Sequence, residues 1–450
     1  RRHGAVEDLV DSVIVRGELE EALRDVTDLE RVMTRIVTGT VNCRDLLGLA
    51  RGFRALPEVK KQLQKMNAPL LQKLEQAIDP LTDCADIIDK MSFIHVDSNL
   101  VPYLSPEDYE TYHDEFVKTG EKRWETSDLW SQRYTFSGKY GANIMEEVAR
   151  YAIVAAQIAK DLEGQFDVIH AHDWLTYYAG IAAKRVSGKP LVVHMHATSF
   201  DRSSSDNIDT RVYEIERAGM EAADMVIAVS NLTRNIVINK YNIEPEKVIA
   251  VHNAVQFAEN DNPVPERGVS DKIVTFLGRI TFQKGPDYFI EAAAKVLKRV
   301  PNVRFVMAGS GDMMNHCIRR AAQLGIADRF HFTGFLKGDD VQKMFQLSDV
   351  YVMPSVSEPF GISPLEAMRS NVPTIISHQS GVAEVLDYAV KVNYWDVDAM
   401  ADAIYGLISY PALAKMFSEK GMEEVNNLKW FNAAIKIKDV YQQAIDKCNK

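Results

Sequence analysis

The sequence predicts an α/β protein with two Rossmann-type parallel-sheet domains in series, preceded by an all-helical segment. Of the 40 aromatic residues (18 Phe, 5 Trp and 17 Tyr), only Phe53 lies among the first 90 positions. From Phe93 onward, short apolar stretches alternate with helical patterns, which is typical of parallel sheets with right-handed crossovers. The polar stretch from Glu259 to Asp271, which contains prolines, divides this alternation into two halves.

Residues 1–90 show helical periodicity. Apolar side chains recur at spacings of three and four, without the alternation of a strand. The pattern includes Leu19, Leu23, Val26, Leu29, Val32, Met33 and Ile36. Pro57 and Pro69 are expected near the starts of further helices, where proline is tolerated.

The strand patterns set the expected domain limits. In the first half, strands are expected in FDVIHAH, KPLVVHMHA, DMVIAVS and KVIAVHNAV. In the second half, they are expected in KIVTFLGRI, VRFVMAGSG, RFHFTGF, SDVYVMPS and VPTIISH. We therefore expect a helical segment at 1–90, Rossmann-like domains at 91–262 and 263–430, and a C-terminal helix at 431–450.

Composition excludes several classes of protein. Hydrophobic residues at 46% and charged residues at 26% are ordinary globular values, so the chain is not mainly disordered. The net charge of −11 argues against a surface built for nucleic acid or anionic lipid. No apolar run approaches the roughly 18 residues that span a bilayer. Four scattered cysteines without a CxxC pair favour a reducing compartment, and we expect a cytoplasmic protein.

Ligands of open parallel sheets bind beyond the carboxyl ends of the strands. Arg279 and Lys284 follow the strand KIVTFLG, on a loop that leads into a helix. A guanidinium and an ammonium group beside a helix N-terminus suit a diphosphate, because they form charge-assisted hydrogen bonds with it. A solvated basic loop is the alternative interpretation.

Two carboxylates follow the strand SDVYVMPS. Glu358 is expected in a loop and Glu366 in the next helix, because Pro364 suits a first helical turn. One carboxylate can then bind ribose hydroxyls while the other faces a sugar. Helix capping or a surface salt bridge is the alternative.

Histidines follow two strands of the first half. His172 and Asp173 end one strand pattern, and His196 ends the next. His170 and His194 lie two residues earlier on the same faces and are expected to be packed. A zinc site from the four histidines is conceivable, but no cysteine or carboxylate has a convincing ligand spacing, so no metal is expected.

Two nucleotide-binding patterns are weak or absent. Gly309 and Gly311 follow a strand, but position 314 is Met where a dinucleotide fingerprint has its third glycine. A tight strand-to-helix turn is sufficient to explain them. The sequence contains no GxxxxGK[ST], so ATP hydrolysis by a P-loop is not supported.

The combination of HAHDW, LGRITFQKG, SEPFGISPLEAM and SGVAEV resembles retaining glycosyltransferases of family 4, over about residues 93–450. The resemblance implies a GT-B pair of Rossmann-like domains, a nucleotide sugar as co-substrate, a carbohydrate acceptor such as a glucan, and no metal cofactor. It implies a hexosyltransferase of carbohydrate biosynthesis.

The resemblance also assigns roles by position. Arg279 and Lys284 correspond to the diphosphate clamp, and Glu366 to the ribose-binding carboxylate. Glu358 corresponds to the glutamate near the donor sugar, and His172 to the catalytic histidine on the acceptor side. Asp173 and His196 are further acceptor-side candidates. The backbone at Phe360, Gly361 and Ile362 is expected to approach the sugar or phosphate, where glycine permits close contact.

Residues 1–90 resemble the helical core of MutS mismatch-repair proteins, through HGAVEDLV and TDLERVMTRIVTGTVNCRDLLGLARGFRALPEVKKQL. The glycosyltransferase resemblance starts at FIHVDSNLVPYL, without the family's opening strand and Gly-rich loop. We therefore expect an incomplete first domain, a join near residues 90 and 91, and weakened sugar transfer. The alternatives are a non-enzymatic fragment or fusion of a MutS-type protein, and a two-domain sugar-phosphate enzyme such as an epimerase.

Overall fold

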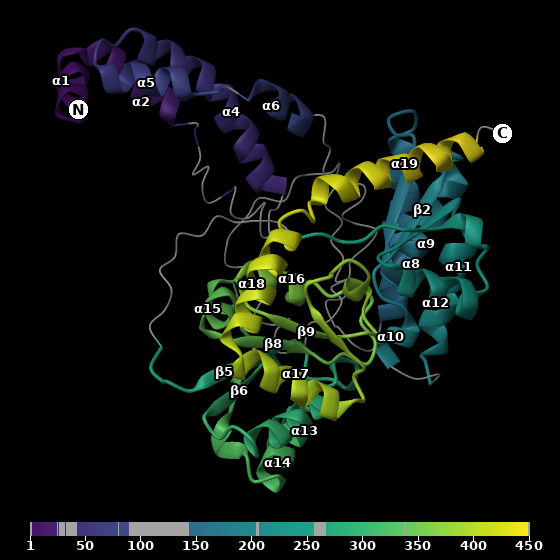
Figure 1. Cartoon of the computed structure of the whole chain (residues 1–450). Helices are drawn as coiled ribbons and strands as arrows, with labels where there is room; N and C mark the ends of the chain where they lie inside the picture. The colour runs from purple at the N-terminus through teal and green to yellow at the C-terminus, as the bar shows by residue number, and fades with distance from the viewer. Residues whose placement is uncertain are drawn as a thin grey trace. The chain divides into compact units, whose positions relative to one another are not determined.

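The computed structural model describes residues 2–24, 26, 32, 43–79, 81–89, 144–203, 207–255, 267–336 and 338–448. Contacts divide the chain into two units, one with the helices of residues 2–89 and one with both sheets (Figure 1). The expected domain limits at 90/91 and 262/263 lie outside the described residues, as do residues 90–143, where the first Rossmann-like domain was expected to begin. Those expectations stay predictions.

The described elements of the first unit are helices, as the periodicity predicts. They are α1 (Arg2–Asp11), α2 (Val13–Leu23), α4 (Cys43–Gln64), α5 (Pro69–Ala77) and α6 (Thr82–Asp89). One buried cluster joins α1, α2, α4 and α5 and includes Leu19, Val59, Leu63, Met66 and Leu71. Pro69 occupies the first turn of α5, as expected.

The expectation for Pro57 was wrong. Pro57 lies inside α4, which continues for 22 residues. A proline within a helix removes one backbone hydrogen bond and costs about 3 kcal/mol. Phe53, Val59 and Leu63 are buried on either side of it. Phe53 belongs to one buried cluster, and Val59 and Leu63 belong to another, so packing on both sides of Pro57 offsets that cost.

The first sheet has four parallel strands in the order β1-β2-β3-β4. The strands are β1 (Ile169–His172), β2 (Leu191–Met195), β3 (Met225–Ala228) and β4 (Val248–Ala250). We call this sheet with its helices the first lobe, and the second sheet with its helices the second lobe. The helices of the first lobe are α8 (Ile144–Asp161), α9 (Asp173–Ser187), α10 (Ser199–Ser203), α11 (Thr210–Ala222) and α12 (Asn231–Tyr241), with the 3-10 turn η1 (Pro245–Lys247). Strands and crossover helices alternate as predicted.

The C-terminal helix α19 (Trp430–Cys448) packs on the first sheet (Figure 1). Ala433, Val440 and Ala444 of α19 form one buried cluster with β2 and β3 residues such as Val192 and Ile227. The chain therefore returns from the second lobe to complete the core of the first.

The second sheet has six parallel strands in the order β10-β9-β8-β5-β6-β7. The strands are β5 (Lys272–Leu277), β6 (Val303–Ala308), β7 (Phe330–Gly334), β8 (Val350–Met353), β9 (Thr374–Ser377) and β10 (Val390–Val392). The helices are α13 (Pro286–Leu297), α14 (Met314–Gln323), α15 (Asp339–Leu347), α16 (Ser363–Arg369), α17 (Val397–Ser409) and α18 (Pro411–Val425). The 3-10 turns are η2 (Phe282–Lys284), η3 (Ala327–Arg329) and η4 (Gly381–Glu384).

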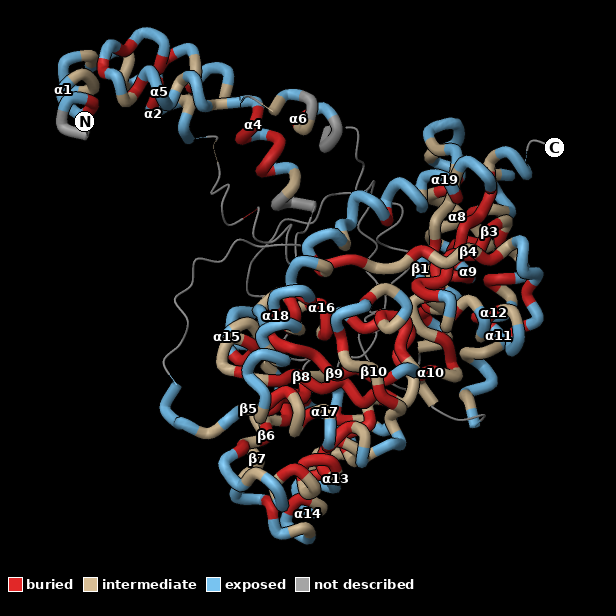
Figure 2. Tube along the Cα trace, in the orientation of Figure 1, coloured by how far each residue is buried: buried red, intermediate tan, exposed pale blue. Residues whose placement is uncertain are grey.

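Both sheets are buried between helices (Figure 2). In the second lobe, Phe276, Phe289 and Phe305 belong to one core with no more than 1% exposure each. Such two-sided burial explains why the strands are apolar runs without alternation. The nine predicted strands are all present, and β10 is an additional one. Within the described residues, no helix combines the length and apolar character that crossing a membrane requires.

The packing of α9 against α11 predicts an effect of one methyl group. A Cβ added to Gly219 would lie 2.3 Å from Tyr177 Cδ2, and Tyr177 is fully buried. We expect Gly219→Ala to lower the free energy of unfolding by about 1–3 kcal/mol through overpacking. In the control Gly406→Ala, the new Cβ meets only Leu413 Cδ2 at 3.7 Å, so helix propensity makes it neutral or stabilising. Urea unfolding measures both, and equal destabilisation by the two variants would contradict this packing.

Candidate functional site

The loop after β5 carries Arg279 and Lys284 at the carboxyl edge of the second sheet. Gly285 has φ +67°, and a Cβ there would lie 2.1 Å from the Pro354 carbonyl oxygen. Only glycine therefore allows this loop to press against the loop that follows β8. The two loops carry most of the candidate donor-binding residues.

Side-chain bonds connect these two loops. Lys284 Nζ donates to Glu358 Oε2 at 2.5 Å, and Ser355 Oγ donates to the same oxygen at 3.2 Å. Gln283 accepts from Arg279 Nη2 at 3.2 Å and donates to the Ser357 carbonyl oxygen at 3.0 Å. The structure thus brings Arg279, Lys284 and Glu358 together, although 74 residues separate the two charged partners.

Residues 358–362 form a tight turn ahead of α16. Glu358 is buried and forms a parallel bridge with Ser380. Gly361 has φ +102°, which side chains rarely tolerate, and a Cβ there would lie 3.2 Å from Glu358 Cγ. The Phe360 carbonyl accepts from the Val382 N–H at 2.7 Å, so this group serves the fold, whereas Ile362 is exposed.

Glu366 lies in α16, whose first turn holds Pro364, as predicted. Burial raises the pKa of the Glu366 carboxyl group, and the charge of Arg369 only partly opposes the shift. Burial in turn lowers the pKa of Arg369. A half-buried carboxylate that has lost part of its hydration is well suited to accept hydrogen bonds from ligand hydroxyl groups.

Gly309 and Gly311 have a packing role. A Cβ on Gly309 would lie 1.8 Å from the Gly278 carbonyl oxygen, and one on Gly311 would lie 2.3 Å from the Ile280 carbonyl oxygen. The turn after β6 therefore packs directly on the backbone of the β5 loop, which agrees with the tight-turn interpretation.

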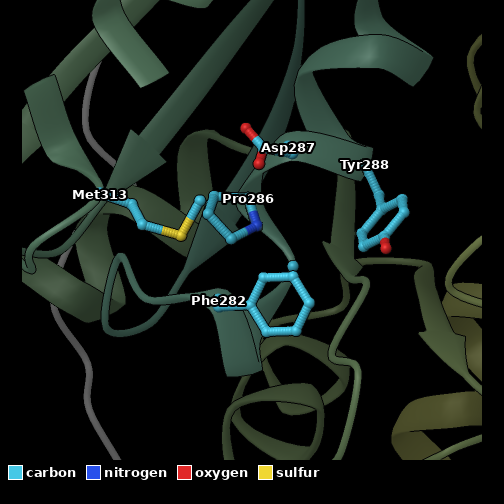
Figure 3. A pocket seen from close by; sticks show the side chains of 6 residues that line it. Phe282, Pro286, Asp287, Tyr288 and Met313 are labelled. Atoms are coloured by element: carbon cyan, nitrogen blue, oxygen red, sulfur yellow. The ribbon is translucent and has the colours of Figure 1, made fainter. Parts of the chain in front are cut away.

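A small hollow lies beside this loop (Figure 3). Its lining consists of Phe282, Gly285, Pro286, Asp287, Tyr288 and Met313. None of Arg279, Lys284, Glu358 and Glu366 belongs to it. The hollow is mostly apolar and is adjacent to the candidate donor residues rather than formed by them.

The acceptor-side candidates meet at the carboxyl edge of the first sheet. His172 is exposed, and its Nδ1 lies 2.9 Å from His196 Nε2. Asp173 Oδ1 accepts the His196 backbone N–H at 2.9 Å. Asp173 has φ +57°, a conformation that is uncommon for residues other than glycine and is often found at functional sites. The structure therefore brings His172, Asp173 and His196 together, and their role on the acceptor side stays a prediction.

His170 and His194 lie one step deeper on the same strands. His194 is buried as expected, and His170 is half-buried. Burial and the neighbouring imidazoles lower the pKa of His194 to about 2 and that of His170 to about 3. Partial loss of hydration within the array of rings, together with the neighbouring His196, also lowers the pKa of His172. These rings are therefore neutral at pH 7.

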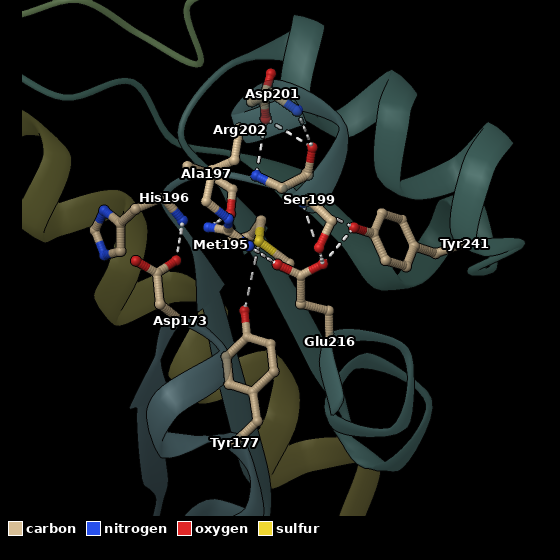
Figure 4. Close-up of polar contacts among 11 residues, drawn as sticks. Asp173, Tyr177, Met195, His196, Ala197, Ser199, Asp201, Arg202, Glu216 and Tyr241 are labelled. Carbon is tan, nitrogen blue, oxygen red and sulfur yellow. Dashed lines mark hydrogen bonds and ion pairs between the residues drawn. The ribbon is translucent and has the colours of Figure 1, made fainter. Parts of the chain in front are cut away.

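A buried polar network holds the turn after β2 (Figure 4). The fully buried Glu216 accepts from Ser199 Oγ at 2.7 Å and from Tyr241 Oη at 2.5 Å, and it pairs with Arg202. Burial raises the pKa of Glu216 in spite of these partners. The network fixes α10, which carries Asp201.

Hydrogen bonds connect the two lobes at this edge. Asp201 Oδ1 accepts from Ser357 Oγ at 2.6 Å, and the Pro359 carbonyl accepts from Ser230 Oγ at 2.6 Å. The Glu384 carboxylate accepts the backbone N–H groups of Asn231 and Leu232 at 2.9 and 2.7 Å. The loop with Glu358 thus lies against the turns that follow β2 and β3.

His252 Nε2 lies 2.7 Å from Glu384 Oε2. Burial acts to raise the pKa of Glu384, but the hydrogen bonds from His252, Asn231 and Leu232 outweigh it and lower the pKa. Sequence reasoning assigned no role to Glu384, Asp201, Ser230 or Ser357. Their only sequence signal is a position just after a strand, and Glu384 also lies within SGVAEV.

The neutral histidines predict a dependence of stability on pH. The pKa of His194 is lower in the folded chain than its ordinary value of 6.5, so between these values the unfolded state binds more protons. The histidine's contribution to stability is therefore lost as the pH falls below 6.5. Between pH 7 and pH 5, we expect the free energy of unfolding to fall by about 2 kcal/mol on this account.

Urea unfolding at both pH values, in buffer with a chelator, measures this loss. His194→Leu should remove it, because an apolar side chain does not titrate. The exposed His331 provides the control His331→Leu, which should retain the loss. An unchanged pH dependence in His194→Leu would contradict the assignment.

Family comparisons place these lobes among known proteins. The family described as Glycosyl transferases group 1 matches residues 257–424, and Glycosyltransferase Family 4 matches residues 126–259. Both lobes are thus matched, in consecutive stretches.

Individual proteins with similar sequences are also glycosyltransferases. An uncharacterised glycosyltransferase of Methanocaldococcus jannaschii is 32% identical over 305 residues, which cover 63% of this chain and 76% of that protein. A D-inositol 3-phosphate glycosyltransferase of Corynebacterium diphtheriae is 25% identical over 334 residues, which cover 69% of this chain and 78% of that protein.

A solved structure has the same arrangement of lobes. The sucrose-phosphate synthase of Thermosynechococcus elongatus superposes with a TM-score of 0.56 at 21% identity, over 68% of this chain and 80% of that one. At this identity the likeness concerns the fold. Together with the family matches and the relative from Methanocaldococcus jannaschii, it shows that the chain belongs to the glycosyltransferases of group 1 and family 4, with a GT-B fold.

Proposed function

We propose that this chain is a retaining hexosyltransferase that moves a sugar from a nucleoside diphosphate sugar to a hydroxyl group of a glucan or another glycoside. The observation that supports this most is the 2.6 Å hydrogen bond between Ser357 and Asp201. It joins the loop that carries Glu358 to the turn that follows His196. This contact between the two loops supports a site that takes groups from both lobes.

On the donor side, Arg279 and Lys284 bind the diphosphate, and Glu366 binds the ribose hydroxyls. Glu358 faces the donor sugar, and the backbone around Gly361 allows close approach. Two preorganised cations supply the positive charge that the departing diphosphate needs, so no metal is required for donor binding. Lys284 pairs with Glu358, so a bound diphosphate competes with this carboxylate for the ammonium group.

In the reaction, the bond between the anomeric carbon and the diphosphate oxygen breaks. The acceptor oxygen forms a bond to the same carbon on the same face, and its proton passes to the departing diphosphate oxygen. His172, with Asp173 and His196, orients the acceptor hydroxyl group. Placing the reacting groups in this way converts an encounter in solution into a step within one complex.

The groups that support sugar transfer all lie between His172 and Glu366. The MutS-like interpretation of residues 1–90 stays a prediction about that segment. A cytoplasmic location and the absence of nucleic-acid binding, both inferred from composition, stay predictions as well.

Removal of one cation should weaken donor binding without any metal present. We expect Lys284→Met and Arg279→Met each to lose roughly 10- to 100-fold in affinity for the nucleoside diphosphate, because a charge-assisted hydrogen bond contributes about 1.5–3 kcal/mol. Calorimetry with UDP, ADP and GDP in EDTA measures this loss. Lys298→Met, at the far end of α13, is the matched control and should bind normally. Wild-type affinity in both loop variants would refute the diphosphate clamp.

Substitutions of the two glutamates should affect the binding of different ligands. Glu366→Gln should weaken the nucleoside diphosphate and the intact donor alike, by roughly 10-fold, because both contain the ribose. Glu358→Gln should leave nucleoside diphosphate affinity unchanged or higher, because Lys284 loses its competing carboxylate, while turnover of the intact donor falls. Glu419→Gln on the surface of α18 is the control. Parallel losses for both ligands in both variants would contradict the division of roles.

A further inference from the structure

Four imidazoles form a continuous array on one face of β1 and β2. His172 and His194 are register partners in the parallel pair, so the histidines two residues away lie on the same face. Ring centroids lie 4.2 Å apart for His170 and His172, and 4.3 Å apart for His194 and His196. Across the strands, His172 and His194 are 5.2 Å apart, and His170 and His194 are 5.4 Å apart. Binding of an acceptor by His172 does not by itself explain the other three histidines of this array.

The inner rings carry nitrogen atoms that lack partners. His194 is only 5% exposed, and neither of its ring nitrogens has a hydrogen-bond partner among the described residues. Within the same part of the chain, His170 Nε2 is also buried without a partner. Leaving buried polar atoms unsatisfied costs about 1–3 kcal/mol each. An ion that accepts one lone pair from each ring would remove part of this cost.

The ligand geometry is compatible with one ion. One ring nitrogen from each of His170, His172 and His194 lies within 4.8 Å of the other two. Zinc bound by nitrogen at about 2.0–2.1 Å needs smaller separations, so zinc binding requires the rings to move closer together. His170 Nδ1 lies 2.6 Å from Tyr441 Oη, so the tyrosine holds the ring by the nitrogen that would not bind the ion. Metal-binding histidines commonly have such an outer hydrogen bond.

We infer that His170, His172 and His194 bind one zinc ion at the carboxyl edge of the first sheet. Three neutral nitrogen ligands without thiolate or carboxylate favour zinc over magnesium or calcium, which prefer oxygen. The exposed His172 leaves the fourth position of the ion open to solvent or to His196. This inference differs from the expectation, drawn from the sequence, that no metal binds here.

Zinc titration of the chelator-stripped full chain tests the site. We expect one zinc ion whose affinity falls by at least roughly 10-fold in both His172→Gln and His194→Leu, and which magnesium does not displace. Tyr441→Phe should also weaken it, because His170 loses its outer hydrogen bond. The control His331→Leu should bind as the wild type does.

Undiminished zinc affinity in His172→Gln would overturn the inference. His172 is exposed, so this variant is expected to fold even if His194→Leu does not. Equal affinity in Tyr441→Phe and wild type would overturn the assignment of Nε2 of His170 as a ligand atom. No sugar enters these measurements, so a failure of the proposed function leaves them intact.

One consequence rests on the proposed role of His172. Bound zinc withdraws this imidazole from the acceptor, so transfer should fall in proportion to zinc occupancy while nucleoside diphosphate affinity stays constant. Transfer that is unaffected at full occupancy would refute this inhibition. A parallel loss of nucleoside diphosphate affinity would also refute it, because zinc would then act on the second lobe.

Discussion

Parallel pairing of the described strands is the constraint on which the site depends. Strands that all run in one direction place every carboxyl end at one edge of the sheet, and the helices that return the chain cover both faces. Loops far apart in sequence must therefore emerge side by side. Lys284 follows β5 and Glu358 follows β8, which is the direct neighbour of β5 in the sheet. The same rule brings His172 beside His196 in the first lobe.

The lobes meet through groups that are held by backbone hydrogen bonds. The side chain of Glu384 is partly exposed, whereas Glu216 is fully buried, and the pKa values of the two carboxyl groups shift in opposite directions. Glu384 accepts two N–H groups at the start of α12 together with His252, and these donors stabilise its charge more than burial opposes it. Glu216 is more deeply buried, and desolvation prevails over Arg202 and Tyr241. The Glu384 carboxylate connects one lobe to the other. The Glu216 carboxylate holds the turn whose Asp201 accepts the hydrogen bond from Ser357.

The candidate site also concentrates features that a purely structural region avoids. Asp173 occupies a left-handed conformation, His194 buries two nitrogens without described partners, and Lys284 and Glu358 form a short ion pair below the surface. Each of these features is unfavourable in free energy, and the packing of the surrounding cores offsets it. Such unfavourable features are frequent where ligands bind. The apolar cores and the glycine contacts between loops hold these groups in place. A binding site on a parallel sheet thus combines a rigid, well-packed core with unfavourable polar groups at the carboxyl edge of the sheet.

The sequence by itself determined the class of fold, nine strands, the helix that begins near Pro364, and the positions of His172, Asp173 and His196 just after two strands of the first half. Apolar runs and turn residues encode these features locally, and the carboxyl-edge rule converts them into neighbours. Tertiary structure alone decided the continuation of α4 through Pro57, the return of α19 to the first sheet, the strand β10, and the bonds of Ser230, Ser357 and Glu384 between lobes. It also decided that the inner histidines bury ring nitrogens that have no partner among the described residues. These features depend on which surfaces meet after folding. The bonds between the lobes, for example, join residues more than 100 positions apart, and such contacts leave no periodic signal in the chain.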